Sequence, residues 1–221
     1  MTQSLLSLQA KICSAVETGK LRIILASASP RRSAALATML GNKQLFEIIV
    51  SDFAEDLPHS EFASAVEYNM ATAKKKAEQV GAKLKSAAPK TLIIAADTVV
   101  ALHDQILEKP SSAADAARML RLLSDTEHQI HTSVVLRELP ENIESFAFTS
   151  TVQVKFAKLN EEEIAAYVAT GEAFDKAGAY EIQGQGRMLV EHIAGDFFSA
   201  VGFPAREFAL HFAKLATGLC F

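Results

Sequence analysis

Apolar and polar positions along the first half of the chain alternate between the spacings of strands and of helices. Nearly continuous apolar runs, which are typical of buried strands, occupy residues 21–27, 46–50 and 91–96. Apolar residues at intervals of three and four predict helices over residues 31–40 and 61–84. This alternation of strand and helix is typical of a sheet that carries helices on its faces.

An antiparallel arrangement is predicted further along the chain. The apolar run resumes at 99–102, and His103-Asp104 predicts a hairpin turn before a short returning strand. Two long strand-like segments, 129–139 and 144–156, are joined by a proline-containing turn and are expected to pair antiparallel. The remaining predicted elements are helices over 112–123, 161–169 and 204–215 and a strand over 188–193. The patterns together predict an α/β fold in which helices flank a mixed sheet.

The first twenty residues stand apart from this alternation. Apolar residues at Leu5, Leu8 and Ile12 follow helical spacing, so residues 1–20 are expected to form one amphipathic helix packed on the body. A targeting peptide is the alternative, although the segment contains no arginine and no clear secretory apolar core. We expect residues 21–221 to form a single domain.

Composition excludes several classes of partner. With 221 residues and 49% hydrophobic content, the chain can bury a substantial core. A net charge of −4 gives no global field that attracts nucleic acid or a membrane, and no apolar stretch reaches the ~20 residues that span a bilayer. The basic stripe with interleaved aromatic residues that binds single-stranded nucleic acid is also missing. We therefore expect neither nucleic acid nor a membrane as a partner.

The two cysteines give an indication of the compartment. Cys13 and Cys220 lie near the two chain ends without metal-ligand spacing, and no cysteine–histidine cluster suggests zinc. This usage predicts no structural disulfide and is typical of a reducing compartment, so we expect a cytoplasmic location.

The first predicted strand ends in small hydroxyl residues and a proline, which two arginines follow. Ser29 is placed to cap the next helix, and Pro30 is favoured at a first helical position. A helix N-terminus attracts anions through its unpaired N–H groups, and the guanidiniums of Arg31 and Arg32 add bidentate recognition of phosphate oxygens. These residues predict a phosphate-binding strand–loop–helix, with an ordinary surface helix as the alternative.

Carboxylates follow two of the predicted strands. Asp97 comes directly after the apolar run 91–96, where a buried carboxylate is costly without a partner. It is suited to holding a metal ion or to acting as a general base toward water, and the alternative is a structural turn with Thr98. Glu55 and Asp56 lie in an acidic loop. With Asp97 they can supply oxygen ligands to Mg²⁺ or Mn²⁺, unless the loop is simply solvated.

Lysines at two places are candidate phosphate contacts. Lys74, Lys75 and Lys76 lie on one predicted helix, where consecutive residues point about 100° apart, so at most two can face a common site. Lys74 follows Met70 by one turn, and we expect it to lean over a cleft while the other two are solvated. Lys109 precedes a proline in a tight connection, which is a reasonable but weak phosphate signal.

A glycine-rich polar segment spans residues 175–186 and contains Asp175, Lys176 and Gln183. Its glycines allow backbone N–H groups to approach a ligand closely. No strand-to-helix turn carries the GxGxxG of dinucleotide-binding folds. The chain has neither a Walker A sequence nor the GxSxG of a nucleophile elbow.

In their order along the chain, these motifs closely resemble the Maf (septum-formation-inhibitor) family of nucleoside triphosphate pyrophosphatases. The resemblance extends from about Arg22 to Leu215. Its motifs are Ser27-Ala28-Ser29-Pro30-Arg31-Arg32, Glu55, Lys74, Ala96-Asp97-Thr98-Val99-Val100, Lys109-Pro110, Leu123-Ser124 with His128 and Thr132, Asp175-Lys176-Ala177-Gly178-Ala179-Tyr180 with Gln183-Gly184, and Val201-Gly202-Phe203-Pro204. Each motif is common alone, whereas their collinear succession is specific.

The resemblance implies hydrolysis of a nucleoside triphosphate to the monophosphate and pyrophosphate. It also implies that residues 21–221 form one catalytic domain with two lobes around a central cleft, as in the inosine triphosphate pyrophosphatases. A divalent metal (Mg²⁺ or Mn²⁺), a homodimer and a cytoplasmic role in removing non-canonical nucleotides are implied as well.

Roles follow from the resemblance position by position. Asp97 is implied as the catalytic carboxylate and Glu55 as its partner acid, both near the metal. Lys74 and Lys109 are implied as catalytic cations on the triphosphate. The implied substrate contacts are Ser27, Ser29, Arg31, Arg32, Thr98, Asp175, Lys176 and Gln183.

Three of these positions bear on the nucleotide. Arg32, Thr98 and Gln183 resemble the determinants of the subfamily that accepts dTTP and UTP. The other main subfamily, which acts on 7-methyl-GTP, has a tryptophan after the Ser-Pro and a glutamate near the position of Gln183. This chain has no tryptophan and carries glutamine at position 183, which favours pyrimidine substrates.

The chain departs from the family pattern at Ala95, Glu108 and Asp125, where glycine is common, and these changes leave the polar groups in place. A competing hypothesis is a nucleotide-binding regulator of cell division without essential catalysis. Such a regulator needs the basic cleft but not an acid pair, so the presence of Glu55 and Asp97 favours the enzyme.

Overall fold

A mixed sheet of seven strands forms the centre of the protein. The computed structural model describes residues 5–84, 89–103 and 105–218. The strands are β1 (Leu21–Leu25), β2 (Glu47–Ile48), β3 (Lys90–Leu102), β4 (Gln105–Leu107), β5 (Glu127–Leu139), β6 (Ile143–Phe156) and β7 (Val190–Ala194). Their spatial order is β2-β1-β3-β5-β6-β7, and β4 pairs with β3 outside this path. β1 runs parallel to β2 and β3, while the remaining pairs are antiparallel.

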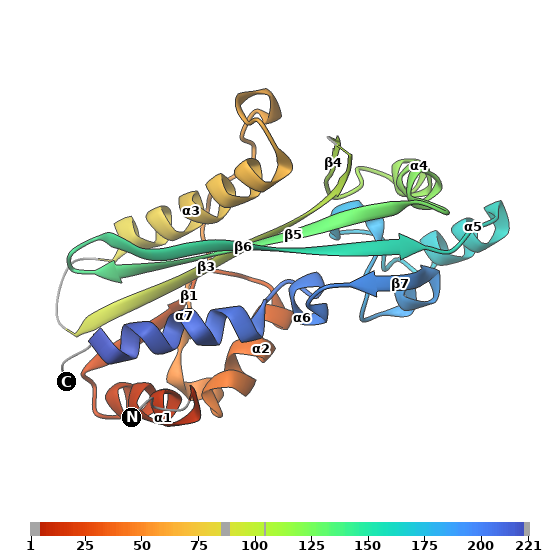
Figure 1. The fold of residues 1–221 in the computed structure, drawn as a ribbon. Coiled ribbons are helices and arrows are strands. Elements are labelled where there is room, and N and C mark those ends of the chain that lie inside the picture. The colour runs from red at the N-terminus through yellow and green to blue at the C-terminus, as the bar shows by residue number, and fades with distance from the viewer. Residues whose placement is uncertain (1–4, 85–88, 104, 219–221) are drawn as a thin grey trace.

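Helices cover the sheet differently at its two ends. They are α1 (Leu5–Glu17), α2 (Pro30–Leu40), α3 (Ala65–Lys83), α4 (Ala113–Leu123), α5 (Glu161–Ala169), α6 (Phe197–Ala200) and α7 (Ala205–Gly218). Figure 1 shows α3 on one face of the sheet and α1, α2 and α7 on the other, whereas α4 and α5 gather at the opposite end. Short 3-10 turns lie at Lys43–Leu45, His59–Glu61, Ala177–Ala179 and Gln185–Leu189.

Three sets of apolar side chains pack on the sheet, because each helix buries its apolar stripe there. One lies between α3 and the sheet, where Val80 packs with Ile93. At one end Leu36 of α2 and Phe208 of α7 pack with Leu92 of β3. At the other end Leu120 of α4 packs in a cluster with Phe156 of β6. The long strands β3, β5 and β6 run through both ends. The two ends of the sheet therefore have separate apolar cores on three shared strands.

Most of the predicted helices and strands are confirmed. The helix caps illustrate the local signals that made these predictions possible. Asn160 caps α5 in a capping box: its side chain accepts a hydrogen bond from the Glu163 N–H at 2.9 Å, and the Glu163 carboxylate accepts from the Asn160 N–H. Ser112 likewise caps α4. The helix predicted within residues 1–20 is α1, which buries Ile12 against the body.

The antiparallel pairs are confirmed as well. β5 and β6 pair over almost their whole lengths, and β4 returns along β3. Asp104 of the predicted hairpin turn and Cys220 lie outside the described residues. The sequence pattern did not predict α6, whose four residues are too few for a periodic signal.

The structure corrects the prediction that a strand ends at Asp97. The strand predicted to end at this residue continues, because β3 runs unbroken from Lys90 to Leu102 and Asp97 pairs with Ser133 of β5. The neighbouring β1 has already ended, with Leu25 opposite Ile94. Asp97 therefore lies inside a strand but beside an open part of the sheet, where a ligand can approach.

Within residues 5–84, 89–103 and 105–218, none of the helices has the length and apolar content that crossing a bilayer requires.

Candidate active site

A cleft of about 730 Å³ lies beside Asp97. Its volume is in the range of small-molecule sites. Its walls come from the β1–α2 connection, the middle of β3, the segment 175–183 and the turn after α6. The predicted residues that line it are Ser27, Ser29, Arg31, Arg32, Glu55, Asp97, Thr98, Lys109, Asp175, Lys176 and Gln183. Of the predicted site residues that the structure describes, Lys74 and Asp56 are missing from this lining.

The N-terminus of α2 opens onto the cleft. Ser29 caps the helix, since its hydroxyl accepts a hydrogen bond from the Arg32 N–H at 3.4 Å, and Pro30 follows as the first helical residue. The Ser27 hydroxyl accepts from the Ser29 N–H at 3.2 Å and fixes the turn before the helix. This geometry leaves the positive end of an eleven-residue helix facing the site.

Asp97 is the centre of a buried polar cluster. The residue is 6% exposed. Its Oδ1 accepts a hydrogen bond from Lys76 Nζ at 2.7 Å, and its Oδ2 accepts one from Asn69 Nδ2 at 2.8 Å. Lys76 Nζ also lies 2.9 Å from Glu55 Oε2. One ammonium group therefore joins both candidate acids, which satisfies the requirement that a buried charge be paired.

The prediction that Lys74 leans over the cleft is wrong. Lys76 instead contacts Asp97 and Glu55. Lys74 is 41% exposed and pairs with Glu144 Oε1 at 3.1 Å, away from the cleft. The reason is helical geometry: Lys76 follows Asn69 by two turns and shares its buried face, whereas Lys74 is rotated away by about 200°. The buried stripe through Asn69, Ala73 and Ala77 is the signal that separates the two lysines.

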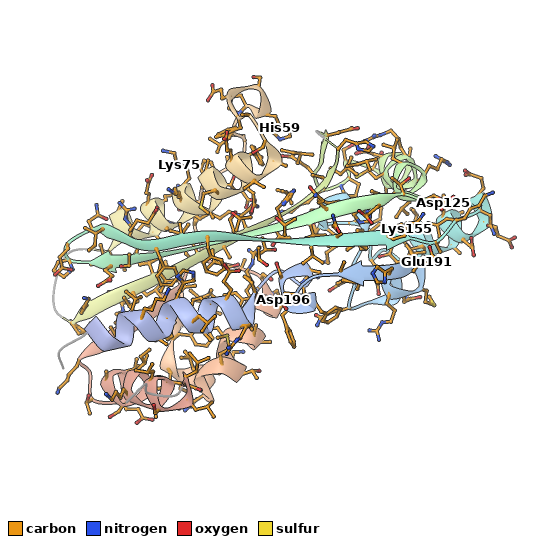
Figure 2. The ribbon with its side chains drawn as sticks, in the orientation of Figure 1. His59, Lys75, Asp125, Lys155, Glu191 and Asp196 are labelled. Carbon is orange, nitrogen blue, oxygen red and sulfur yellow. The ribbon has the colours of Figure 1, made fainter. Side chains whose placement is uncertain are left out.

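The loop that carries Glu55 is fastened to the β4–α4 connection. Glu55 has φ +57°, in the left-handed region, and its carbonyl oxygen lies 3.4 Å from the Tyr68 hydroxyl. Glu108 Oε1 accepts from Tyr68 at 2.8 Å and lies 2.9 Å from His59 Nε2, in the loop before α3 (Figure 2). Burial and the Glu108 contact raise the pKa of Tyr68. These contacts hold Glu55 and Lys109 on the same side of the cleft. Asp56 is exposed and does not line it.

Arg32 and Thr98 belong to a directed chain of hydrogen bonds. Arg32 Nη2 donates to Thr98 Oγ1 at 2.9 Å, Thr98 lies 3.0 Å from Thr132 Oγ1, and Thr132 donates to the Ser199 carbonyl at 2.9 Å. Since arginine only donates and a carbonyl only accepts, Thr98 must donate to Thr132. Arg32 also donates to the Gly202 carbonyl at 3.0 Å. Burial lowers the pKa of Arg32, while the charges of the two acids counter this shift.

The opposite wall carries cations paired with an acid that sequence reasoning missed. Arg31 Nη1 forms an ion pair with Glu181 Oε1, and Lys176 Nζ lies 3.5 Å from Glu181 Oε2. Gln183 is exposed at the cleft in the same segment. No local pattern marks Glu181, because its partner Arg31 is 150 positions away in the chain.

The segment from 181 to 186 is held by Glu172, a second residue that the sequence did not indicate. Glu172 Oε1 accepts from the Gln185 N–H at 2.9 Å, and Oε2 accepts from the Gly186 N–H at 3.3 Å. A Cβ atom on Gly184 would lie 2.5 Å from Glu172 Oε1, so a larger residue here would require the carboxylate to shift.

Comparisons with known proteins assign the family. Residues 22–215 match the family described as Maf-like protein. The probable bifunctional dTTP/UTP pyrophosphatase/methyltransferase protein of Homo sapiens is 42% identical over 204 residues, which are 88% of this chain and 32% of the human protein. The dTTP/UTP pyrophosphatase of Carboxydothermus hydrogenoformans is 41% identical over 184 residues, which are 83% of this chain and 93% of that protein.

One solved structure resembles the chain more distantly. A HAM1 protein from Coxiella burnetii aligns with a TM-score of 0.48 and 16% identity, over 90% of this chain and 100% of that one. The assignment rests on the family match over residues 22–215 and on the sequence relatives, and by these the chain belongs to the Maf-like protein family.

Proposed function

We propose that this protein is a nucleoside triphosphate pyrophosphatase, which hydrolyses a nucleoside triphosphate to the monophosphate and pyrophosphate. The observation that carries the proposal is a buried acid, Asp97, which opens onto a cleft lined by Arg31, Lys109 and Lys176. A triphosphate requires several cations, and its hydrolysis requires a base close to them. The relatives named dTTP/UTP pyrophosphatase support the same activity.

The reaction that we propose needs no covalent intermediate. The oxygen of a water molecule forms a bond to the α-phosphorus, and the bond from that phosphorus to the bridging oxygen of pyrophosphate breaks. Asp97 orients the water and accepts its proton, while Lys76 and Asn69 hold the two carboxylate oxygens in place. Arg31 and Lys109 stabilise the charge that develops on the phosphate oxygens.

Glu55 and Asp97 are the residues that would hold a divalent metal, and we propose Mg²⁺ or Mn²⁺. They contact the same ammonium group, so they face each other across it. Among the described residues no group of three or more His, Cys, Asp or Glu converges. A pair of carboxylates fits an ion that completes its shell with phosphate and water. When bound, such an ion neutralises phosphate charge. Activity lost with a chelator and restored by Mg²⁺ or Mn²⁺ would support this proposal.

Pyrimidine nucleotides, dTTP and UTP, are the substrates that we propose. Gln183 is exposed at the cleft, where its amide can both donate and accept toward the edge of a pyrimidine. Arg32 and Thr98 act less directly, because they already bond to one another and to Thr132. Their side chains set the shape of the wall behind the substrate.

We further propose a homodimer in the cytoplasm. The family resemblance implies both, and the apolar side chains of Phe197 and Phe198 are 41% and 58% exposed, which suits a subunit interface. The free thiol of Cys13 is consistent with a reducing compartment. Light scattering of the purified protein gives the oligomeric state, and a monomer at all concentrations would reject the dimer.

The activity is tested by incubating the purified protein with Mg²⁺ and a panel of canonical and modified nucleoside triphosphates. Pyrophosphate release is measured, with release of inorganic phosphate as the control. We expect pyrophosphate and monophosphate in equal amounts, fastest from dTTP or UTP. Binding of nucleotide without release of pyrophosphate would instead favour the regulator.

A further inference from the structure

An acidic side chain lies in the part of the cleft where phosphate is expected. Glu181 is half-buried, and each of its carboxylate oxygens contacts a different cation. Oε1 pairs with Arg31 at the N-terminus of α2, and Oε2 lies 3.5 Å from Lys176 Nζ. Both cations line the cleft together with Glu181. The carboxylate therefore occupies two of the groups that the proposed function assigns to the triphosphate.

The backbone fixes Glu181 in this position. Its N–H donates to the Tyr167 hydroxyl at 3.0 Å, and that hydroxyl lies 3.3 Å from Glu172 Oε2. Burial raises the pKa of Tyr167 to about 12, so the phenol stays protonated and can donate to Glu172. A Cβ atom on Gly186 would lie 2.6 Å from the Glu181 carbonyl oxygen, which shows how closely the chain packs here. The contact between Glu181 and Arg31 is thus set by the fold.

A carboxylate and a phosphate compete for the same guanidinium. Both anions accept charge-assisted hydrogen bonds from arginine in the same forked geometry. Arg31 Nε is buried and makes no hydrogen bond among the described residues, so the partner of this side chain is Glu181. An arriving phosphate must therefore compete with the carboxylate for the Nη1 group of Arg31.

We propose that Glu181 is a built-in counter-anion that competes with phosphate for Arg31 and Lys176 and thereby sets the affinity of the cleft for polyphosphate. This inference rests on the proposed function, because it takes the cleft to bind a triphosphate. A triphosphate reaches several cations at once and displaces the carboxylate. Pyrophosphate and the nucleoside monophosphate each contact fewer cations than the triphosphate does. Glu181 therefore returns to Arg31 and favours the release of these products.

The test is the affinity for inorganic pyrophosphate, measured by calorimetry in metal-free buffer. Glu181→Gln keeps the size of the side chain and removes its charge. We expect it to bind pyrophosphate about tenfold more tightly than the wild type, since the competing anion is gone. KM for dTTP should fall, and kcat should not rise. Circular dichroism checks the fold, and Glu181→Ala should shift the affinity in the same direction.

Glu191→Gln is the matched control. Glu191 is exposed on β7 (Figure 2) and is absent from the lining of the cleft, and its substitution removes the same unit of charge. We expect its pyrophosphate affinity to stay within twofold of the wild type. An equal gain in both variants would overturn the proposal, because net charge alone would then account for it.

An unchanged or weaker pyrophosphate affinity in Glu181→Gln would also overturn the proposal. If turnover were lost at that unchanged affinity, Glu181 would instead take part in the chemical step. Failure of the proposed function looks different, because the wild type would then release no pyrophosphate from any nucleotide.

Discussion

The two walls of the cleft hold their polar groups in opposite ways. On one side, β3 lines the cleft with Asp97, and Lys76 of α3 supports this wall from behind. Asp97 and Lys76 are 6% and 8% exposed, and their charges are paired before any ligand arrives. On the other wall Tyr180 lines the cleft, and its hydroxyl lies 2.8 Å from Nε2 of His128, which is buried behind that wall; burial favours the neutral form of both groups. The charged groups of that wall stand in the partly exposed segment 175–183.

This difference matches the tasks that we assign to the walls. A reacting group must be held within a fraction of an ångström, which a helix and a long strand can do. Recognition of a nucleotide relies on groups in loops, which a rigid scaffold positions. Substitutions on the α3–β3 wall should therefore cost turnover and stability together, whereas substitutions on the loop wall should change selectivity.

Lys76→Met should have the largest effect on stability among the predictions that follow. It leaves Asp97 buried without its ammonium partner, so we expect the free energy of unfolding to fall by about 3 kcal/mol. Turnover should fall by at least about 100-fold, because Asp97 and Glu55 lose the group that joins them. Urea unfolding and steady-state kinetics measure the two effects.

Lys74→Met is the matched control on the same helix. It removes an exposed ion pair with Glu144, which is worth less than about 1 kcal/mol. Turnover should stay within about twofold of the wild type. Equal losses of turnover in both variants would contradict the assignment of Lys76 to the site.

The neutral pair on the loop wall predicts a pH dependence of stability. Burial lowers the pKa of His128 to about 4, from an unfolded value near 6.5. Because the unfolded chain binds this proton more readily, His128 contributes no penalty above pH 6.5 and destabilises the fold as the pH falls toward 4. The expected loss between pH 7 and pH 5 is about 2 kcal/mol.

His128→Gln isolates this contribution, because it keeps a hydrogen-bonding side chain and removes the titration. Urea unfolding at a series of pH values gives the two stability curves. We expect the variant to lose about 2 kcal/mol less than the wild type between pH 7 and pH 5. Parallel curves would show that His128 does not stay neutral in the fold.

Gly184→Ala should disturb recognition while sparing the chemical step. The new methyl group would meet the Glu172 carboxylate, which holds the N–H groups of Gln185 and Gly186. We expect KM for dTTP to rise about tenfold and kcat to change little.

A double-mutant cycle locates the cause of this effect. In a Glu172→Ala background the methyl group has no carboxylate to meet, so Gly184→Ala should add almost nothing further. The measurement is KM for the four proteins. Simple additivity would show that Gly184 does not act through Glu172.

Gln183→Ala should have the smallest effect and the most selective one. The amide is exposed and lines the cleft, so its loss should leave the fold and kcat intact. We expect the preference for UTP over a purine nucleotide, as a ratio of kcat/KM values, to change about fivefold. An unchanged ranking across the nucleotide panel would remove Gln183 from the specificity determinants.

Local signals predicted much of the fold. The cap at Ser29 and the capping box at Asn160 each involve residues within three positions, so the sequence contains the whole interaction. The hairpin of β5 and β6 follows from two strand patterns and a short turn. The break expected after Asp97 was wrong, because a polar residue interrupts an apolar pattern without ending a strand that stays paired with β5.

Only the site residues that belong to sequence motifs were predictable. Lys74 and Lys76 differ by two positions and carry the same charge, and packing of α3 on the sheet selects between them. Glu181 and Glu172 were missed because each acts on groups brought near by the fold. The contact between Glu181 and Arg31 joins residues 150 positions apart, and no periodic pattern encodes it.

The central claim is that the Asp97 carboxylate performs the hydrolysis, and Asp97→Asn tests it most directly. This variant should fold, because the Asn69 Oδ1 atom is buried without a hydrogen-bond partner among the described residues. The Asn69 amide can therefore turn over and accept a hydrogen bond from the new amide. Lys76 keeps Glu55 as a partner.

The measurement is a single-turnover experiment with excess enzyme, Mg²⁺ and dTTP, which records the release of pyrophosphate. We expect Asp97→Asn to be at least about 1,000-fold slower than the wild type. Its affinity for the non-cleavable α,β-imido analogue of dUTP should stay within a few-fold of the wild type. A folded Asp97→Asn protein that releases pyrophosphate within about tenfold of the wild-type rate would contradict the account.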